Sequence, residues 1–172
     1  MCSSDLAWGE LFLEKYNRTE ALKSFQMALQ ADARWTPALV GSARALSDDN
    51  PPQAVSLAKR ALELNPSSVD AYVFLAEEAT DAGHHDEALE ALDKALAVNP
   101  SSLEALAWRG AIAFIKDKPQ DFEAEAAKTL AIAPNYGDVY RIAGELAAHN
   151  YRFDEAVDLT RRALAQIGRA HV

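Results

Sequence analysis

Apolar residues recur three and four positions apart through most of the chain, in runs that short polar breaks separate. In one such run the apolar positions are Tyr72, Leu75, Ala76 and Ala79, which is the spacing of one face of an α-helix. The breaks hold turn-forming residues, such as 47–50 and 82–85. The pattern therefore predicts helices joined by tight turns.

The helices are predicted to come in pairs of fixed length. Pro66, Pro100 and Pro134 lie 34 residues apart, and proline ends a helix because it lacks an amide donor and clashes with the preceding turn. Residues 67–70 and 101–104 have the pattern of a capping box, which starts a helix. Each period is thus interpreted as helix, turn, helix and proline-marked turn.

In these residues the chain resembles the tetratricopeptide repeat proteins. The unit at 69–102 has the family's small and large residues in register, namely Tyr72, Leu75, Ala76, Ala79, Gly83, Ala88, Leu92, Ala95 and Pro100. Similar units are assigned to residues of about 2–35, 36–68, 103–136 and 137–170. The unit at 103–136 departs most, with Arg109 at a usually apolar place and Phe122 where a small residue is usual.

The resemblance implies an all-α fold, a right-handed α-solenoid of about five antiparallel helix-turn-helix hairpins with incomplete terminal units. Alanines at Ala76, Ala88 and Ala95 are expected to let paired helices approach closely. Asn50 before Pro51 is expected to start a second helix, where proline costs no hydrogen bond.

Both ends of the chain differ in character from its interior. Residues 1–6 and 167–172 match the translation of a common sequencing adapter, so we interpret them as non-native scars. The native array would then be residues 7–166, a fragment of a longer bacterial protein, and the sequence leaves its compartment open between cytoplasm and periplasm.

Composition narrows the classes of function. The chain has 17 basic and 26 acidic residues and a net charge of −9, which disfavours nucleic acid and anionic membranes as partners. No apolar run approaches the roughly 18 residues of a membrane helix. Catalytic motifs are absent, and His84-His85-Asp86 is interpreted as a solvated turn, so we expect no enzyme activity, no cofactor and no metal.

Binding in a concave groove is the function that the resemblance implies, because the first helix of each unit lines that groove in the family. Aromatic and charged residues there would suit a protein or peptide segment of apolar and basic character. The groove residues expected from this rule are Arg44, Val73, Phe74, Glu77, Asp81, Trp108, Ala111, Phe114, Ile115, Arg141 and Glu145.

Other interpretations stay open from the sequence. Trp108, Phe114 and Ile115 would alternatively pack against a neighbouring hairpin. The array could also be the N-terminal region of a larger bacterial enzyme, for example one with a zinc peptidase-like domain, whose zinc ligands this chain lacks. A third hypothesis is end-to-end self-association through uncapped termini.

Overall fold

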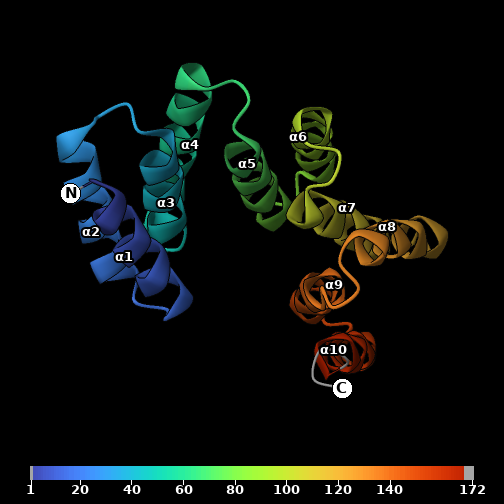
Figure 1. Cartoon of the computed structure of the whole chain (residues 1–172). Helices are drawn as coiled ribbons and strands as arrows, with labels where there is room; N and C mark the ends of the chain where they lie inside the picture. Colours follow the sequence, from blue (N-terminus) through green and yellow to red (C-terminus); the bar gives the residue numbers. More distant parts are fainter. Residues whose placement is uncertain (1, 169–172) are drawn as a thin grey trace. The chain divides into compact units, whose positions relative to one another are not determined.

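The computed structural model describes residues 2–168, and these form α-helices and connecting turns with no β-strand among them (Figure 1). The helices are α1 (Cys2–Glu14), α2 (Arg18–Ala31), α3 (Thr36–Leu46), α4 (Pro51–Leu64), α5 (Val69–Asp81), α6 (His85–Val98), α7 (Leu103–Ile115), α8 (Pro119–Ile132), α9 (Asp138–His149) and α10 (Phe153–Gly168). The predicted all-α class is confirmed. Of the suspected scars, residues 1 and 169–172 lie outside the described part.

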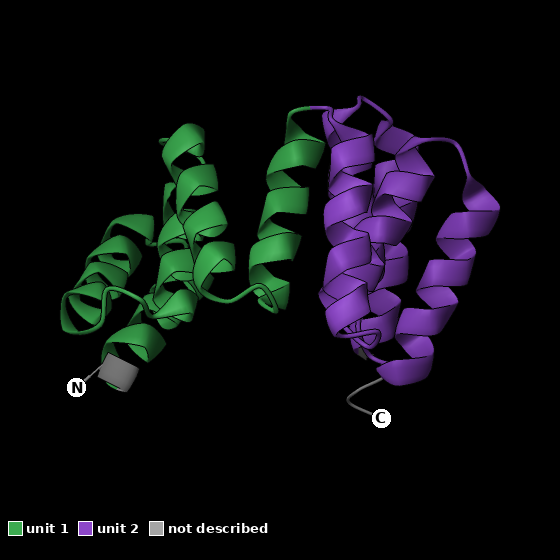
Figure 2. Cartoon of the chain, turned by 90° about the horizontal axis from the view of Figure 1, so that it is seen from above, with its two compact units in different colours: residues 1–82 green, residues 83–172 purple. Residues whose placement is uncertain are grey.

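The chain divides into two compact units, residues 1–82 and 83–172, which Figure 2 colours separately. In the first, α1 packs on α2 and α3 on α4, while α5 packs on α3 and α4. In the second, α7 packs on α8 and α9 on α10, and α7 also packs on α6 and α9. The division falls in the turn after α5, inside the sequence unit assigned to 69–102.

The helix starts show which capping predictions hold. Asn50 accepts a hydrogen bond from the amide of Gln53 at 3.3 Å, directly before the proline pair that opens α4. Ser102 is the N-cap of α7 and accepts one from the amide of Ala105 at 3.4 Å, one residue later than the box predicted at 101–104, in which Ser101 would cap Glu104. Ser68, and not Ser67 of the box predicted at 67–70, is the N-cap of α5, and its side chain makes no capping hydrogen bond.

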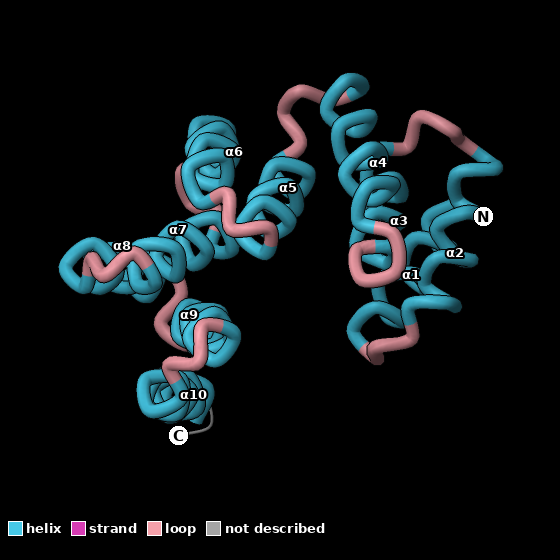
Figure 3. The backbone as a smooth tube through the Cα atoms, turned by 180° about the vertical axis from the view of Figure 1, so that it is seen from behind, coloured by secondary structure: helices cyan, strands magenta, loops and turns pink. Residues whose placement is uncertain are grey.

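A left-handed residue closes the turn between the two helices of most units. Tyr16, Gly83, Asp117 and Tyr151 occupy equivalent positions, and each has a φ between 55° and 77°. The loops that contain them are the short pink segments between paired helices in Figure 3. The turn at 47–50 is one residue shorter, and none of its residues has a positive φ.

Phe25 fills the core between the first three helices. It is fully buried in a cluster with Ala21 and Ala45. Gly9 of α1 and Gly41 of α3 both face its ring, and a Cβ atom at either glycine would overlap ring carbons of Phe25. These two glycines therefore allow α1 and α3 to approach α2 closely.

The core of residues 83–172 is built around aromatic rings. Phe122 is buried and meets Phe114 edge-on, with ring centroids 5.3 Å apart, and Tyr140 at 6.1 Å. The Arg162 guanidinium lies 4.1 Å from the centroid of Tyr140, a cation–π geometry. Phe122 thus fills the place where a small residue is usual, because neighbouring rings pack around it.

Candidate functional site

Two of the groove residues expected on α5 lie in the core instead. Val73 and Phe74 are buried, and Phe74 packs in a cluster with Ala43, Ala54 and Ala58. Their predicted exposure is therefore wrong, since neighbouring side chains cover the helix face on which they stand. Neither offers surface to a ligand.

The charged groove residues of this unit hold helices together. Arg44 of α3 pairs with Glu77 of α5 at 3.3 Å, and both side chains are largely covered. Arg18 of α2 donates to the carbonyl oxygen of Arg44 at 2.9 Å and pairs with Asp48 at 3.0 Å. Only Asp81, in the last turn of α5, is exposed among the expected groove residues here.

Glu78 lies beside this network, and the charges of the network shift its pKa. Partial burial and the carboxylates of Asp81 and Asp48 raise the pKa of Glu78, while Arg18 lowers it. The shift therefore arises from burial and from the like charges of neighbouring carboxylates.

In the second unit the expected aromatic patch is mostly packing surface. Ala111 is fully buried in the core, which corrects its expected place in the groove. Trp108, Phe114 and Ile115 are partly buried against the same core. Phe114 also lies under the Arg152 guanidinium, 4.6 Å from the ring centroid. Most of each side chain is therefore in contact with the protein, and only part of it is exposed to solvent.

Arg141 and Glu145 are the most accessible of the expected residues in this unit. Both stand on α9, where Arg141 donates to Asp138 at 2.6 Å and to Glu145 at 2.8 Å. Partial burial lowers the pKa of Arg141, but the hydrogen bonds to Asp138 and Glu145 outweigh it, so the net shift is upward. All three groups lie on one helix, so these pairs tie no two helices together.

A cavity of about 450 Å³ opens between α7 and α8, with one wall from α6. Its apolar lining is Leu89, Ile112, Ala113 and Ala124, and its charged lining is Arg109, Lys116, Lys118, Asp121, Glu125 and Lys128. Four cations and two carboxylates face this space in a chain whose net charge is −9. The charged side chains that line the cavity therefore have a net positive charge, opposite in sign to that of the whole chain.

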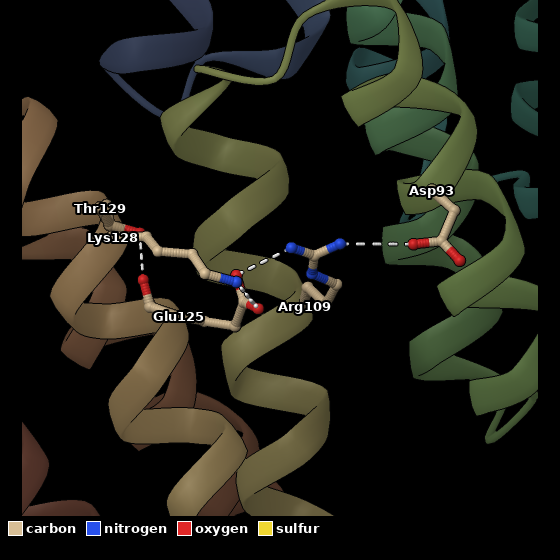
Figure 4. A network of polar contacts seen from close by, with 5 residues as sticks. All are labelled: Asp93, Arg109, Glu125, Lys128 and Thr129. Atoms are coloured by element: carbon tan, nitrogen blue, oxygen red, sulfur yellow. Dashed lines mark hydrogen bonds and ion pairs between the residues drawn. The ribbon is translucent and has the colours of Figure 1, made fainter.

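Arg109 organises one side of the cavity (Figure 4). Its guanidinium bonds Glu125 at 2.9 Å and lies 3.4 Å from Asp93. Lys128 donates to the other oxygen of Glu125 at 2.8 Å, and that side chain is only 12% exposed. Lys118, by contrast, makes no salt bridge within residues 2–168, and its charge acts only at longer range on Asp86, whose pKa it helps to lower.

One signal for this cavity is present in the sequence, but the groove rule does not use it. Arg109 departs from the family's usual apolar choice, and the space lies on a different face of α7. Arg109, Ile112 and Lys116 line it, whereas the expected groove face carries Trp108, Ala111 and Ile115. Successive helical positions differ by about 100° in direction, so the two faces are distinct.

The histidine turn forms a smaller hollow. Residues 83–87 line about 320 Å³ together with Lys116, which pairs with Asp86 at 2.8 Å. This bond lowers the pKa of Asp86. The N-cap of α6 is His84, not a capping carboxylate. Within the described residues, no three or more His, Cys, Asp or Glu side chains are placed to hold a metal ion.

None of the described helices is long and apolar enough to cross a membrane.

Comparison with known proteins shows which family model and which solved structures this chain is similar to. Residues 45–112 match the family model described as tetratricopeptide repeat. A search of curated proteins finds no match. Among solved structures, TTC0263 of Thermus thermophilus, a thermophilic protein of this kind, is 22% identical over 96% of this chain and 91% of its own, with a TM-score of 0.77.

Two further solved structures share the fold. PilF of Pseudomonas aeruginosa is 16% identical over 98% of this chain and 75% of its own, with a TM-score of 0.72. YrrB, described as having an unusual peptide-binding site, is 18% identical over 94% of this chain and 84% of its own, with a TM-score of 0.55. At these identities the likeness concerns the fold.

Proposed function

The chain belongs to the tetratricopeptide repeat proteins, an all-α solenoid class, and from this premise we propose that it is a non-catalytic module that binds a protein or peptide segment. YrrB, which shares the fold, carries a peptide-binding site, and this supports the proposal by analogy.

The cavity between α7 and α8 is the observation that carries the proposal. Its size suits one or two side chains of a ligand, and the part of its lining that Leu89, Ile112 and Ala113 form is apolar. A closely packed hairpin would fill such a space, so an opening lined by apolar and charged side chains is suited to an inserted side chain.

The charged side chains that line the cavity favour a ligand of a particular charge. Lys118 makes no salt bridge in the described part of the chain. Lys116 pairs with the exposed carboxylate of Asp86, and Lys128 pairs with Glu125, which Arg109 also binds. A segment with one large apolar side chain flanked by Asp or Glu would place its carboxylates near these ammonium groups. We therefore propose an acidic, apolar segment for the cavity.

The first-helix groove is the second place for a ligand. Within residues 83–172 its accessible members are Arg141 and Glu145, together with the exposed parts of Trp108 and Ile115. The Glu145 carboxylate favours the apolar and basic segment expected from the sequence. The two sites thus differ in the charge of the segment that each would take.

Two peptide pools separate these sites. One fluorescent pool carries Asp and Glu around Leu or Phe, and the other carries Lys and Arg around the same residues. We expect Lys118→Glu to weaken binding of the acidic pool about fivefold or more, the effect of roughly 1 kcal/mol, as measured by fluorescence polarisation. Lys94→Glu, an exposed change on α6 outside the cavity, is the matched control.

The groove has its own variants in the same assay. Trp108→Ala and Arg141→Ala should alter binding of the basic pool and leave the acidic pool unchanged. If neither pool binds the wild-type chain, the proposed function fails. If Lys94→Glu weakens the acidic pool as much as Lys118→Glu does, the cavity is not the site.

The alternative of an array that precedes a zinc peptidase-like domain has no observation in this chain to favour it. Self-association, the other partner class that the sequence raises, rests on different side chains, those of α1 and α10, and it is a separate proposal.

A further inference from the structure

An apolar face of α10 is open to solvent. Phe153, Val157, Leu164 and Ile167 are all exposed, and Leu164 is 64% exposed. Spacings of four, seven and three residues place these side chains along one side of the helix. Ala156, Leu159 and Ala163 lie on another side and are buried in the core with α9. The helix therefore has two apolar faces, of which only one is covered.

The repeat shows what covers this position elsewhere. Leucine recurs at Leu29, Leu62, Leu96, Leu130 and Leu164. Leu29 packs against a cluster that includes Leu39 and Val40 of the next first helix, and Leu62 against a cluster that includes Ala71. Leu130 likewise packs against the core that contains Val139. In each of these three cases the cluster includes residues of the first helix of the following unit.

The first helix of the chain has the matching open face. Trp8 is 55% exposed and Leu11 is 40% exposed. Of the positions equivalent to Leu11 in later units, Ala45, Ile112 and Leu146 are buried and Glu78 is half-buried. Ala45 clusters with Phe25 of the preceding helix, and Leu146 clusters with Phe122. Trp8 is likewise equivalent to Leu75, which packs against a cluster that includes Ala54 and Ala58 of the preceding α4, whereas the same position of α7 is Arg109. First helices thus use this face to cover the second helix before them.

We propose that the open face of α10 is covered by α1 of a second copy of the chain. Leu164 and Val157 of one copy would meet Trp8 and Leu11 of the next, which repeats the relation that each interior leucine has with its following helix. The interface is heterologous, so copies add head to tail and the assembly does not close at two.

Light scattering on the full chain, from micromolar to millimolar concentration, gives the first test. We expect the average molar mass to rise continuously above that of one chain. Leu164→Arg and Trp8→Arg each remove one face and should each give monomers. Their matched controls, Ala165→Arg and Ala7→Arg, place the same charge on an exposed neighbouring position of the same helix and should associate as the wild type does.

Mixing the two monomeric variants tests the orientation. The Trp8→Arg chain keeps its α10 face, and the Leu164→Arg chain keeps its α1 face, so an equimolar mixture should form a one-to-one dimer that grows no further. Circular dichroism should show equal helicity in all variants, since the changed side chains are exposed.

Three results would overturn the proposal. A wild-type chain that stays monomeric at millimolar concentration would exclude it, leaving the face to some other helix. Association of Trp8→Arg alone would indicate that α10 pairs with α10. A mixture that stays monomeric would exclude contact between the two faces. The peptide pools read out the proposed cavity separately, because Lys118 is unchanged in these variants.

Discussion

At the scale of single residues, the left-handed turn position shows how context overrides preference. Gly83 has the residue type that a positive φ favours, but Tyr16 and Tyr151 adopt nearly the same conformation with a large side chain. The sequence predicted a turn at 82–85 from its glycine. It could not predict the tyrosine turns, because the repeat length imposes their geometry and residue type does not.

Replacing Tyr16 tests the cost of this conformation. A left-handed residue other than glycine costs about 1–2 kcal/mol, and the Tyr16 side chain is 92% exposed, so few contacts repay it. We expect Tyr16→Gly to be about 1 kcal/mol more stable than Tyr16→Ala, after the entropy that glycine adds to the unfolded chain. Urea denaturation followed by circular dichroism measures the difference. Equal stability of the two variants would show that the turn carries no strain.

At the scale of helices, the sequence predicted the elements well and their exposed faces less well. Proline, asparagine and serine signals marked helix ends at Asn50 and Ser102, because capping is local. The exposure of Val73, Phe74 and Ala111 was mispredicted, since burial depends on which neighbouring helix lies against a face. A repeat pattern fixes the position of a residue on its helix, but whether its side chain is buried depends on residues that are distant in sequence.

The close approach of α1, α2 and α3 leads to a prediction for Gly41. An added methyl group would overlap the Phe25 ring, so Gly41→Ala should destabilise the chain by about 1–3 kcal/mol through overpacking. Thermal or urea unfolding measures this loss. In the same background Phe25→Leu should restore part of it by making room.

Gly144→Ala is the matched control for that experiment. Its Cβ would meet Ala156 and Leu159 at ordinary distances of 3.4 Å, so only helix propensity changes, which favours alanine by up to about 1 kcal/mol. If Gly41→Ala destabilised the chain no more than Gly144→Ala does, the close contact between Gly41 and the Phe25 ring would be disproved.

At the scale of the molecule, electrostatic forces act on the two proposed activities in opposite directions, although the net charge is −9. Copies that meet through apolar faces repel each other as like-charged bodies. An acidic segment in the cavity is instead held by nearby ammonium groups. Added salt screens both the repulsion and the attraction.

We therefore expect sodium chloride to separate the two activities. Raising it from about 0.05 M to 0.5 M shortens the screening length from over 10 Å to about 4 Å. End-to-end association should strengthen, as seen by light scattering, while polarisation of the acidic peptide pool should fall. A change of the same sign in both measurements would contradict one of the assigned mechanisms.

The period of 34 also shows what sequence alone leaves unresolved about the whole chain. It treats residues 69–102 as a unit like the others, yet the boundary between the two compact parts falls after Ala82. The cavity beside Arg109 was equally hidden, because one unusual residue reveals a departure from the repeat without revealing its shape.

The ladder of leucines from Leu29 to Leu164 has a consequence for how such a gene can change. Each interior leucine packs against a cluster that includes the following helix, so recombination between two similar segments could delete or duplicate a whole unit in frame and leave the remaining interior leucines covered. A change of one residue inside a turn is also tolerated, as the shorter turn at 47–50 shows. Variation in unit number is therefore the change in length that this architecture tolerates best.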